Sequence, residues 1–189
     1  MNCAASPDSS ILSLNRTIAL VGLMGVGKST VGRRLASRLC LPFADGDHEI
    51  ESAAGMTVSE IFTSRGENEF RAGEARVMKR LLEGPPIVLA TGGGAMMNAE
   101  TRALLKKHAV TVWMRADLDV IAERVGRRDT RPLLRGRNTL EVLRELADKR
   151  YPIYAEADLT VDVGVGSHGA AVELMLNELR RYAQARTSS

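Results

Sequence analysis

One run of residues has the composition and spacing of a phosphate-binding loop. The run Gly22-Leu-Met-Gly-Val-Gly-Lys-Ser-Thr30 fits the pattern G-x-x-x-x-G-K-[ST]. Glycines let the backbone curl so that successive N–H groups face a phosphate chain, at the start of a helix whose dipole favours anions. Lys28 would then place a positive charge on the outer phosphates, and the Ser29 hydroxyl is a suitable ligand for Mg²⁺. The predicted nucleotide-binding residues of the loop are Gly25, Val26, Gly27, Lys28, Ser29 and Thr30.

The surroundings of this loop argue against an accidental glycine-rich turn, because a strand is predicted before it and a helix after it. The loop does not identify a reaction, since hydrolases, switches and small-molecule kinases all carry one. The chain has 189 residues, which leaves little room for a motor or a regulatory domain. A small kinase is therefore the most economical interpretation.

Two acids, Asp45 and Asp47, lie at the end of the next predicted strand. Strand ends of an open parallel sheet face the ligand crevice, so both carboxylates could reach the site. One could support Mg²⁺ through water, and the other could orient a hydroxyl group and accept its proton. The alternative is that Asp47 simply caps the helix that starts at His48. Spacing alone favours neither interpretation.

Glycines and arginines further along the chain complete the candidate site. Gly92, Gly93 and Gly94 follow a predicted buried strand and form a backbone against which a ligand can lie. Arg71 lies in a helix otherwise patterned for burial, and Arg150 falls at the end of a helix just before Pro152. An arginine half-buried at a crevice needs an anion, and a planar guanidinium suits a carboxylate.

Residues 124–137 hold six arginines against one acid. A mobile lid that closes on polyphosphate explains this stretch better than a nucleic-acid surface, because the chain has few aromatic residues.

The elements that would position these residues alternate between strand and helix. Short apolar runs, two of which lead into glycine, alternate with segments that repeat apolar residues every three or four positions. Strands are predicted over residues 17–22, 41–45, 86–91, 109–114 and 158–163. Helices are predicted from Lys28, from the capping box Thr57–Glu60, over 67–82, after Asn98, after Asp117, from 138 or 139 to Pro152, and over 168–185. This order predicts one α/β domain over 17–186, a parallel sheet covered on both faces, and a loose leader over 1–16.

Composition narrows the class of protein. Apolar residues make up 44% and charged residues 26% of the chain, with a net charge of +3. That excess is too small to indicate nucleic-acid binding by itself, and seven aromatic residues leave little for base stacking.

Cys3 and Cys40 have no neighbours at metal-ligand spacing and are expected to be free thiols. Without a signal peptide or an apolar run of spanning length, a cytoplasmic protein with no membrane partner is expected.

Six motifs in order resemble the shikimate kinase family over about residues 17–180. They are the phosphate loop, Phe43-x-Asp-x-Asp47, Gly66-Glu67-x-x-Phe70-Arg71-x-x-Glu74, Thr91-Gly-Gly-Gly94, Arg131-Pro-Leu-Leu134 and Lys149-Arg150-x-Pro-x-Tyr154. The resemblance implies the nucleoside monophosphate kinase fold: a three-layer α/β/α arrangement with a five-stranded parallel sheet, an arginine-rich lid over about 126–138, and a helical substrate-binding segment. It also implies that ATP phosphorylates the 3-hydroxyl of shikimate, on the route to chorismate and the aromatic amino acids.

The resemblance further implies roles for individual residues. Asp47 would bind substrate hydroxyls and act as the base, and Asp45 would hold Mg²⁺ through water beside Ser29. The substrate carboxylate would be bound by Arg71 and Arg150, with Gly93 and Gly94 against the ring. Arg131 would reach the γ-phosphate from the lid, and Arg124 would lie along the adenine. The rival hypotheses are a kinase for another polyol acid, such as gluconate, and a nucleotide-binding module without catalysis. A monomer is expected.

Overall fold

A five-stranded, all-parallel sheet of order β2-β3-β1-β4-β5 forms the centre of the molecule. The structure is a computed structural model that describes residues 8–126, 138–164 and 166–187. The strands are β1 (Thr17–Val21), β2 (Phe43–Asp45), β3 (Val88–Ala90), β4 (Ala109–Arg115) and β5 (Leu159–Asp162). Each begins or ends within two residues of its predicted position, and the predicted α/β class with a five-stranded parallel sheet is confirmed.

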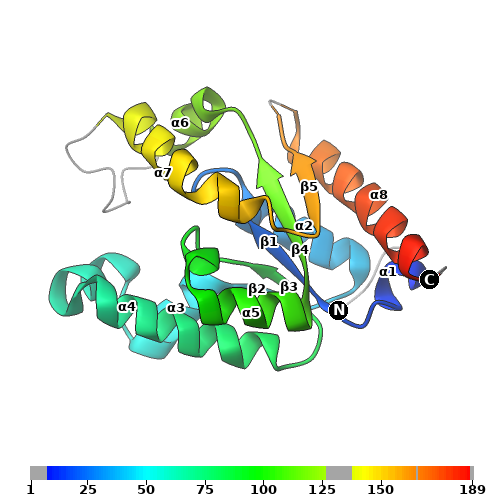
Figure 1. Cartoon of the computed structure of the whole chain (residues 1–189), viewed down its shortest axis with the longest axis horizontal. Helices are drawn as coiled ribbons and strands as arrows, with labels where there is room; N and C mark the ends of the chain where they lie inside the picture. Colours follow the sequence, from blue (N-terminus) through cyan, green and yellow to red (C-terminus); the bar gives the residue numbers. More distant parts are fainter. Residues whose placement is uncertain (1–7, 127–137, 165, 188–189) are drawn as a thin grey trace.

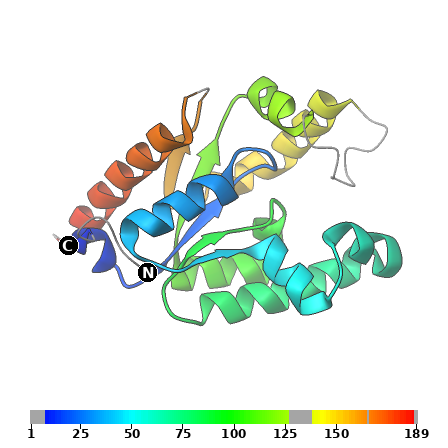
Figure 2. The same ribbon diagram turned by 180° about the vertical axis from the view of Figure 1, so that it is seen from behind.

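Helices cover both faces of the sheet. They are α1 (Ser9–Leu12), α2 (Lys28–Leu39), α3 (Gly46–Ala54), α4 (Val58–Leu82), the 3₁₀ helix η1 (Ala95–Met97), α5 (Ala99–His108), α6 (Leu118–Gly126), α7 (Thr139–Tyr154) and α8 (His168–Thr187). Helices α5 and α7 lie on the face turned to the viewer in Figure 1, and α2 lies on the opposite face, seen in Figure 2. Helices α3 and α4 lie side by side and project past the β2 edge of the sheet.

The pairing of the strands aligns their carboxyl ends. All five residues of β1 are buried, as expected for a central strand covered on both faces. Leu20 of β1 and Asp45 of β2 both pair with Ala90 of β3. The segments that follow these three strands therefore emerge at the same edge of the sheet. That edge is where an open parallel sheet binds its ligands.

Helix α4 begins and bends where the sequence predicts. The Thr57 side chain accepts a hydrogen bond from the backbone N–H of Glu60, and the Glu60 carboxylate accepts one from the backbone N–H of Thr57. This reciprocal pair satisfies two otherwise unpaired donors at the helix start. Gly66 has a non-helical backbone (φ 80°, ψ 172°). It separates the capped segment from the one predicted to start at Glu67.

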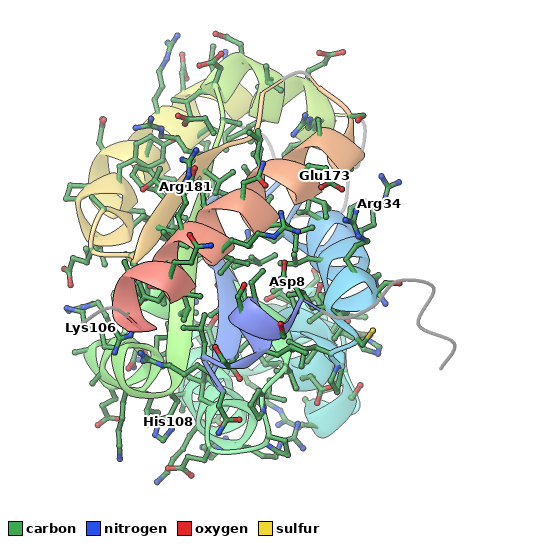
Figure 3. All side chains as sticks on the ribbon, turned by 90° about the vertical axis from the view of Figure 1, so that its right-hand side faces the viewer. Asp8, Arg34, Lys106, His108, Glu173 and Arg181 are labelled. Atoms are coloured by element: carbon green, nitrogen blue, oxygen red, sulfur yellow. The ribbon has the colours of Figure 1, made fainter. Side chains whose placement is uncertain are left out.

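The predicted loose leader is wrong for its described part. Residues Ser9–Leu12 form α1, and Ile11 is buried in the main core. Asp8 accepts a hydrogen bond from Arg180 of α8, against which α1 packs, as Figure 3 shows from the side. An apolar side chain and an ion pair thus fix a segment that the polar composition of residues 1–16 did not predict to be ordered.

The cysteines differ from the prediction at Cys40. Cys40 is disulfide-bonded, so the expectation of a free thiol is wrong there, and Cys3 lies outside the described residues. Sequence spacing does not report which sulfur atoms a fold brings within bonding distance. No helix in the described ranges is both long and apolar enough to span a bilayer.

Candidate active site

The phosphate loop lies between β1 and α2, as predicted. Gly22, Gly25 and Gly27 have φ values of +142°, +80° and +104°, which side chains rarely adopt. At Gly22 a Cβ atom would also lie 2.6 Å from the backbone oxygen of Met114, so only glycine fits. The Nζ atom of buried Lys28 donates to the carbonyl oxygens of Gly22 and Leu23, at 2.9 Å each. These two bonds hold the lysine against the loop that is expected to bind phosphates.

The predicted metal ligands supply oxygen donors of the kind Mg²⁺ prefers. Ser29 is exposed in the first turn of α2, and Asp45 ends β2. The Oδ1 atom of Asp45 accepts the backbone N–H of Asp47 at 3.2 Å, so Asp45, and not Asp47, caps α3. The described residues contain no group of three or more His, Cys, Asp or Glu side chains that could hold a metal ion.

Three consecutive glycines at the end of β3 bring four functional side chains together. A Cβ atom at Gly92 would lie 2.6 Å from Oε1 of Glu74 and 2.9 Å from Oδ1 of Asp47. One at Gly93 would lie 3.1 Å from Nη1 of Arg150, and one at Gly94 would lie 2.5 Å from Nη1 of Arg71. Any side chain here would displace these groups. The glycines are therefore required by close approach of α3, α4 and α7 to the strand end.

Arg71 is oriented by an acid on its own helix. Its Nη1 atom donates to Oε2 of Glu74 at 2.8 Å, three residues along α4, and its Nη2 atom donates to exposed Glu67 at 3.2 Å. Burial raises the pKa of Glu74, Arg71 acts against this, and the nearby Asp47 carboxylate raises it further. Oε1 of Glu74 has no hydrogen-bond partner among the described residues. This cluster of carboxylates thus retains capacity to accept a donor.

Arg150 is buried beside Gly93 with donors to spare. Its Nη1 atom donates to the Gly93 carbonyl at 2.9 Å, and the Tyr154 hydroxyl donates to the same oxygen. Burial raises the pKa of Tyr154 to about 12, so its hydroxyl remains a donor. No carboxylate in the described part of the chain forms an ion pair with Arg150. A guanidinium has five N–H donors, so this one can bind an anion.

Pro152, which was predicted to end or kink α7, lies in the last turn of the helix. The helix continues through Pro152 to Tyr154. A proline in the last turn removes a single backbone hydrogen bond, which the packing of buried Tyr154 offsets. Continuation of the helix places Arg150 and Tyr154 four residues apart on one face, which explains their shared contact with Gly93.

Arg124 of α6 lies beside the phosphate loop. Its guanidinium donates to the carbonyl of Val26 at 3.4 Å and to that of Gly164, in the loop between β5 and α8, at 3.1 Å. A cavity of about 80 Å³ opens there, lined also by Val31, Leu174 and His168. The arginine thus bridges two of the segments that line this partly apolar cavity next to the loop.

The structure brings most predicted site residues to one edge of the sheet. Arg131 and the proposed lid, apart from its end residues 126 and 138, lie outside the described residues. Three contributors were not predicted to have roles: Glu74, Tyr154 and His168. Glu74 had a usable signal, namely a carboxylate three residues after Arg71 on a buried helix face. His168 had no such signal, because nothing in the sequence relates it to the phosphate loop. In the structure, a Cβ atom built on Gly27 would lie 3.8 Å from Cδ2 of His168.

A phosphate loop, paired acids and paired arginines at the carboxyl edge of a five-stranded parallel sheet define a P-loop phosphotransferase with a small acidic acceptor. Residues 24–180 match the family model described as shikimate kinase. The chain is 59% identical over 166 residues to the shikimate kinase of Caulobacter vibrioides, covering 88% of this chain and 83% of the relative. This chain belongs to the shikimate kinase family, and it is an ATP-dependent phosphotransferase acting on a hydroxyl group.

Solved structures agree with this assignment. Shikimate kinase from Acinetobacter baumannii in complex with shikimate superposes with a TM-score of 0.85 at 37% identity, covering 89% of this chain and 96% of that one. A gluconokinase from Sinorhizobium meliloti has a TM-score of 0.66 at 19% identity, over 92% of this chain and 96% of that one. The second likeness is one of fold alone.

Proposed function

We propose that this chain transfers the γ-phosphoryl group of ATP to the 3-hydroxyl of shikimate, giving shikimate 3-phosphate and ADP. The observation that carries the acceptor assignment is buried Arg150, which faces the three glycines and has no ion-paired carboxylate among the described residues. A buried charge without a partner is costly. An acidic substrate would supply the missing anion, and Arg71 would bind the same carboxylate from the other side of Gly93 and Gly94.

Asp47 is the proposed base. Its carboxylate lies against Gly92, next to the glycines that Arg150 and Arg71 approach, so a ring seated on Gly93 and Gly94 would present its hydroxyl groups to it. Asp47 would orient the hydroxyl in line with the γ-phosphorus and accept its proton as the new P–O bond forms. ADP leaves when the bond from the γ-phosphorus to the bridging oxygen breaks.

Cations would neutralise the charge on the transferred group. Lys28 would turn from the Gly22 and Leu23 carbonyls to the phosphates, and Arg131 would approach from the lid. Ser29 and Asp45 would hold Mg²⁺, the latter through water, and the ion would neutralise phosphate charge when bound. Arg124 would lie along the adenine, in the recess that it shares with His168.

The proposal includes a cytoplasmic monomer without nucleic-acid or membrane partners. Its setting would be the synthesis of chorismate and the aromatic amino acids. Gel filtration of the purified chain tests the monomer, and filter binding across salt concentrations tests for nucleic acid.

The first experiment is ADP release from MgATP with shikimate, gluconate or no acceptor. Turnover with shikimate alone supports the proposal. Turnover with gluconate would favour the polyol-acid rival, and tight ATP binding without turnover would favour a non-catalytic module. Arg71→Ala is expected to raise the KM for shikimate, and an unchanged KM would refute the carboxylate contact.

A further inference from the structure

A second cavity lies between α3 and α4. It has a volume of about 290 Å³, close to the lower end of the range for small-molecule sites. None of its lining residues belongs to the phosphate loop, the three glycines or the proposed acid and arginine pairs. The lining residues are Ile50, Ala53, Ala54, Ile61, Arg65, Glu69, Phe70, Gly73, Arg76, Val77 and Arg80. We call it the α3–α4 cavity.

The floor of the α3–α4 cavity is apolar. Ile50, Ile61, Phe70 and Val77 are buried and form a small core of their own, separate from the main core. These side chains are the reason that α3 and α4 pack together beside the sheet. A ligand that fits this floor must have an apolar body.

The rim of the cavity is cationic. Arg76 pairs with Glu69 at 3.6 Å, and Arg80 pairs with Glu49 at 2.7 Å. Arg65 has no ion pair or hydrogen bond with any residue that the structure describes. Three guanidinium groups against two carboxylates leave one net positive charge, which a single anionic group would balance.

A glycine in the cavity wall has no conformational reason to be there. Gly73 lies inside α4, and a Cβ atom on it would meet only Nη2 of Arg76, at 3.9 Å. Glycine in a helix interior costs about 1 kcal/mol relative to alanine. What it does provide is space, because any longer side chain at residue 73 would project into the cavity.

From these observations we propose that the α3–α4 cavity binds a small monoanion with a compact apolar body, such as an aromatic monocarboxylate. The apolar part would rest on Ile61, Phe70 and Val77, and the anionic group would meet Arg65 at the rim. The site is separate from the substrate and nucleotide sites. It does not depend on the proposed acceptor.

The test uses the full chain with saturating MgATP, so that the nucleotide site is filled. The fluorescent probe is 8-anilinonaphthalene-1-sulfonate, an apolar anion, and benzoate is the competing carboxylate. Gly73→Ile fills the cavity, and Gly73→Ala is its matched control because it strengthens the helix while leaving most of the space. Arg65→Gln removes the cation that has no partner among the described residues. Arg34→Gln, at an exposed position of α2 that is labelled in Figure 3, is its control.

We expect saturable probe binding that benzoate displaces in the wild type and in both controls. Gly73→Ile and Arg65→Gln should each weaken binding about tenfold or more, the equivalent of about 1.4 kcal/mol. Thermal unfolding checks that each variant folds, and Arg65→Gln decides alone if Gly73→Ile does not fold. Three results would overturn the proposal: no saturable binding, no displacement by benzoate, or Arg65→Gln indistinguishable from Arg34→Gln.

Discussion

The Arg71 guanidinium donates a 2.8 Å hydrogen bond to the Glu74 carboxylate, whose side chain is only 3% exposed. The two residues are one helical turn apart, so the bond fixes the arginine without bringing in another element. It holds the Arg71 guanidinium against Gly94. Arg71 is thus oriented before any substrate arrives, which reduces the ordering cost of binding.

Glu74→Gln should therefore weaken substrate binding more than it slows turnover. The amide keeps the shape of the side chain but loses the charge that holds Arg71 in place. We expect the KM for shikimate to rise about tenfold, since a hydrogen bond to a charged group contributes about 1.5–3 kcal/mol, while kcat changes much less. Steady-state kinetics at saturating MgATP measures both constants.

Glu67→Gln is the matched control for this substitution. Glu67 also pairs with Arg71, but its side chain is 63% exposed, and exposed pairs contribute little. Near-normal kinetics are expected. If the two variants shifted KM equally, Glu74 would have no special part in orienting Arg71.

Glu74 should also give the stability of the protein a particular pH dependence. Burial raises its pKa in the folded state above the ordinary 4.5, so over that interval the folded chain binds more protons than the unfolded chain. The Glu74 contribution is complete below pH 4.5 and is lost as pH rises through the raised folded value. The unfolding free energy of the wild type, relative to Glu74→Gln, should fall across this window and then level off.

Urea unfolding of both proteins from pH 4 upward measures this difference. Asp8 provides a contrast of opposite sign. Its hydrogen bond from Ser10, together with Arg180, lowers its pKa, so its contribution is lost as pH falls. If the unfolding free energy of the wild type, relative to that of Glu74→Gln, rose with pH, burial would not be the dominant influence on the pKa of Glu74.

The fold and the phosphate loop were predictable from sequence because both depend on local patterns. Short apolar runs predicted the strands, and G-x-x-x-x-G-K-[ST] placed Lys28 at the loop. The acceptor side depends on tertiary proximity, which spacing does not encode. The Gly93 carbonyl accepts hydrogen bonds from Arg150 and Tyr154, which lie 57 and 61 positions further along the chain. His168, near the C-terminal end of the chain, lies beside the loop at Gly27.

Local rules also failed where packing outweighed them. Pro152 predicted an end or a kink in α7, but the helix continues to buried Tyr154, two residues further on. A loose leader was predicted over residues 1–16, but Ile11 and the Asp8–Arg180 pair fix its described part. In both cases a buried side chain contributes to the local structure.

Gly22→Ala should disrupt the phosphate loop. The substitution combines a φ of +142° with a Cβ placed 2.6 Å from the rigid backbone oxygen of Met114. Gly55→Ala is the control, because its φ of +65° is also positive but no atom lies within 4 Å of its Cβ. Gly55→Ala should lose about 1 kcal/mol of stability from strain alone, whereas Gly22→Ala should lose more and bind ATP poorly. Equal losses by chemical denaturation, with ATP affinity intact, would show that the close approach to Met114 does not constrain the loop.

Lys28→Ala should abolish most turnover while leaving the fold intact. The Nζ atom of the lysine donates to two carbonyl oxygens of the loop at 2.9 Å each, so the ammonium group already lies where phosphates are expected to bind. Removing a cation that stabilises the transferred group is expected to cost on the order of 10³-fold in kcat, as for arginine fingers. Arg131→Ala should have a loss of the same order if that residue reaches the γ-phosphate. Single-turnover ADP release by folded, ATP-saturated variants separates this effect from weakened binding. A folded Lys28→Ala variant with near-normal turnover would mean that the charge on the phosphates is neutralised by another group.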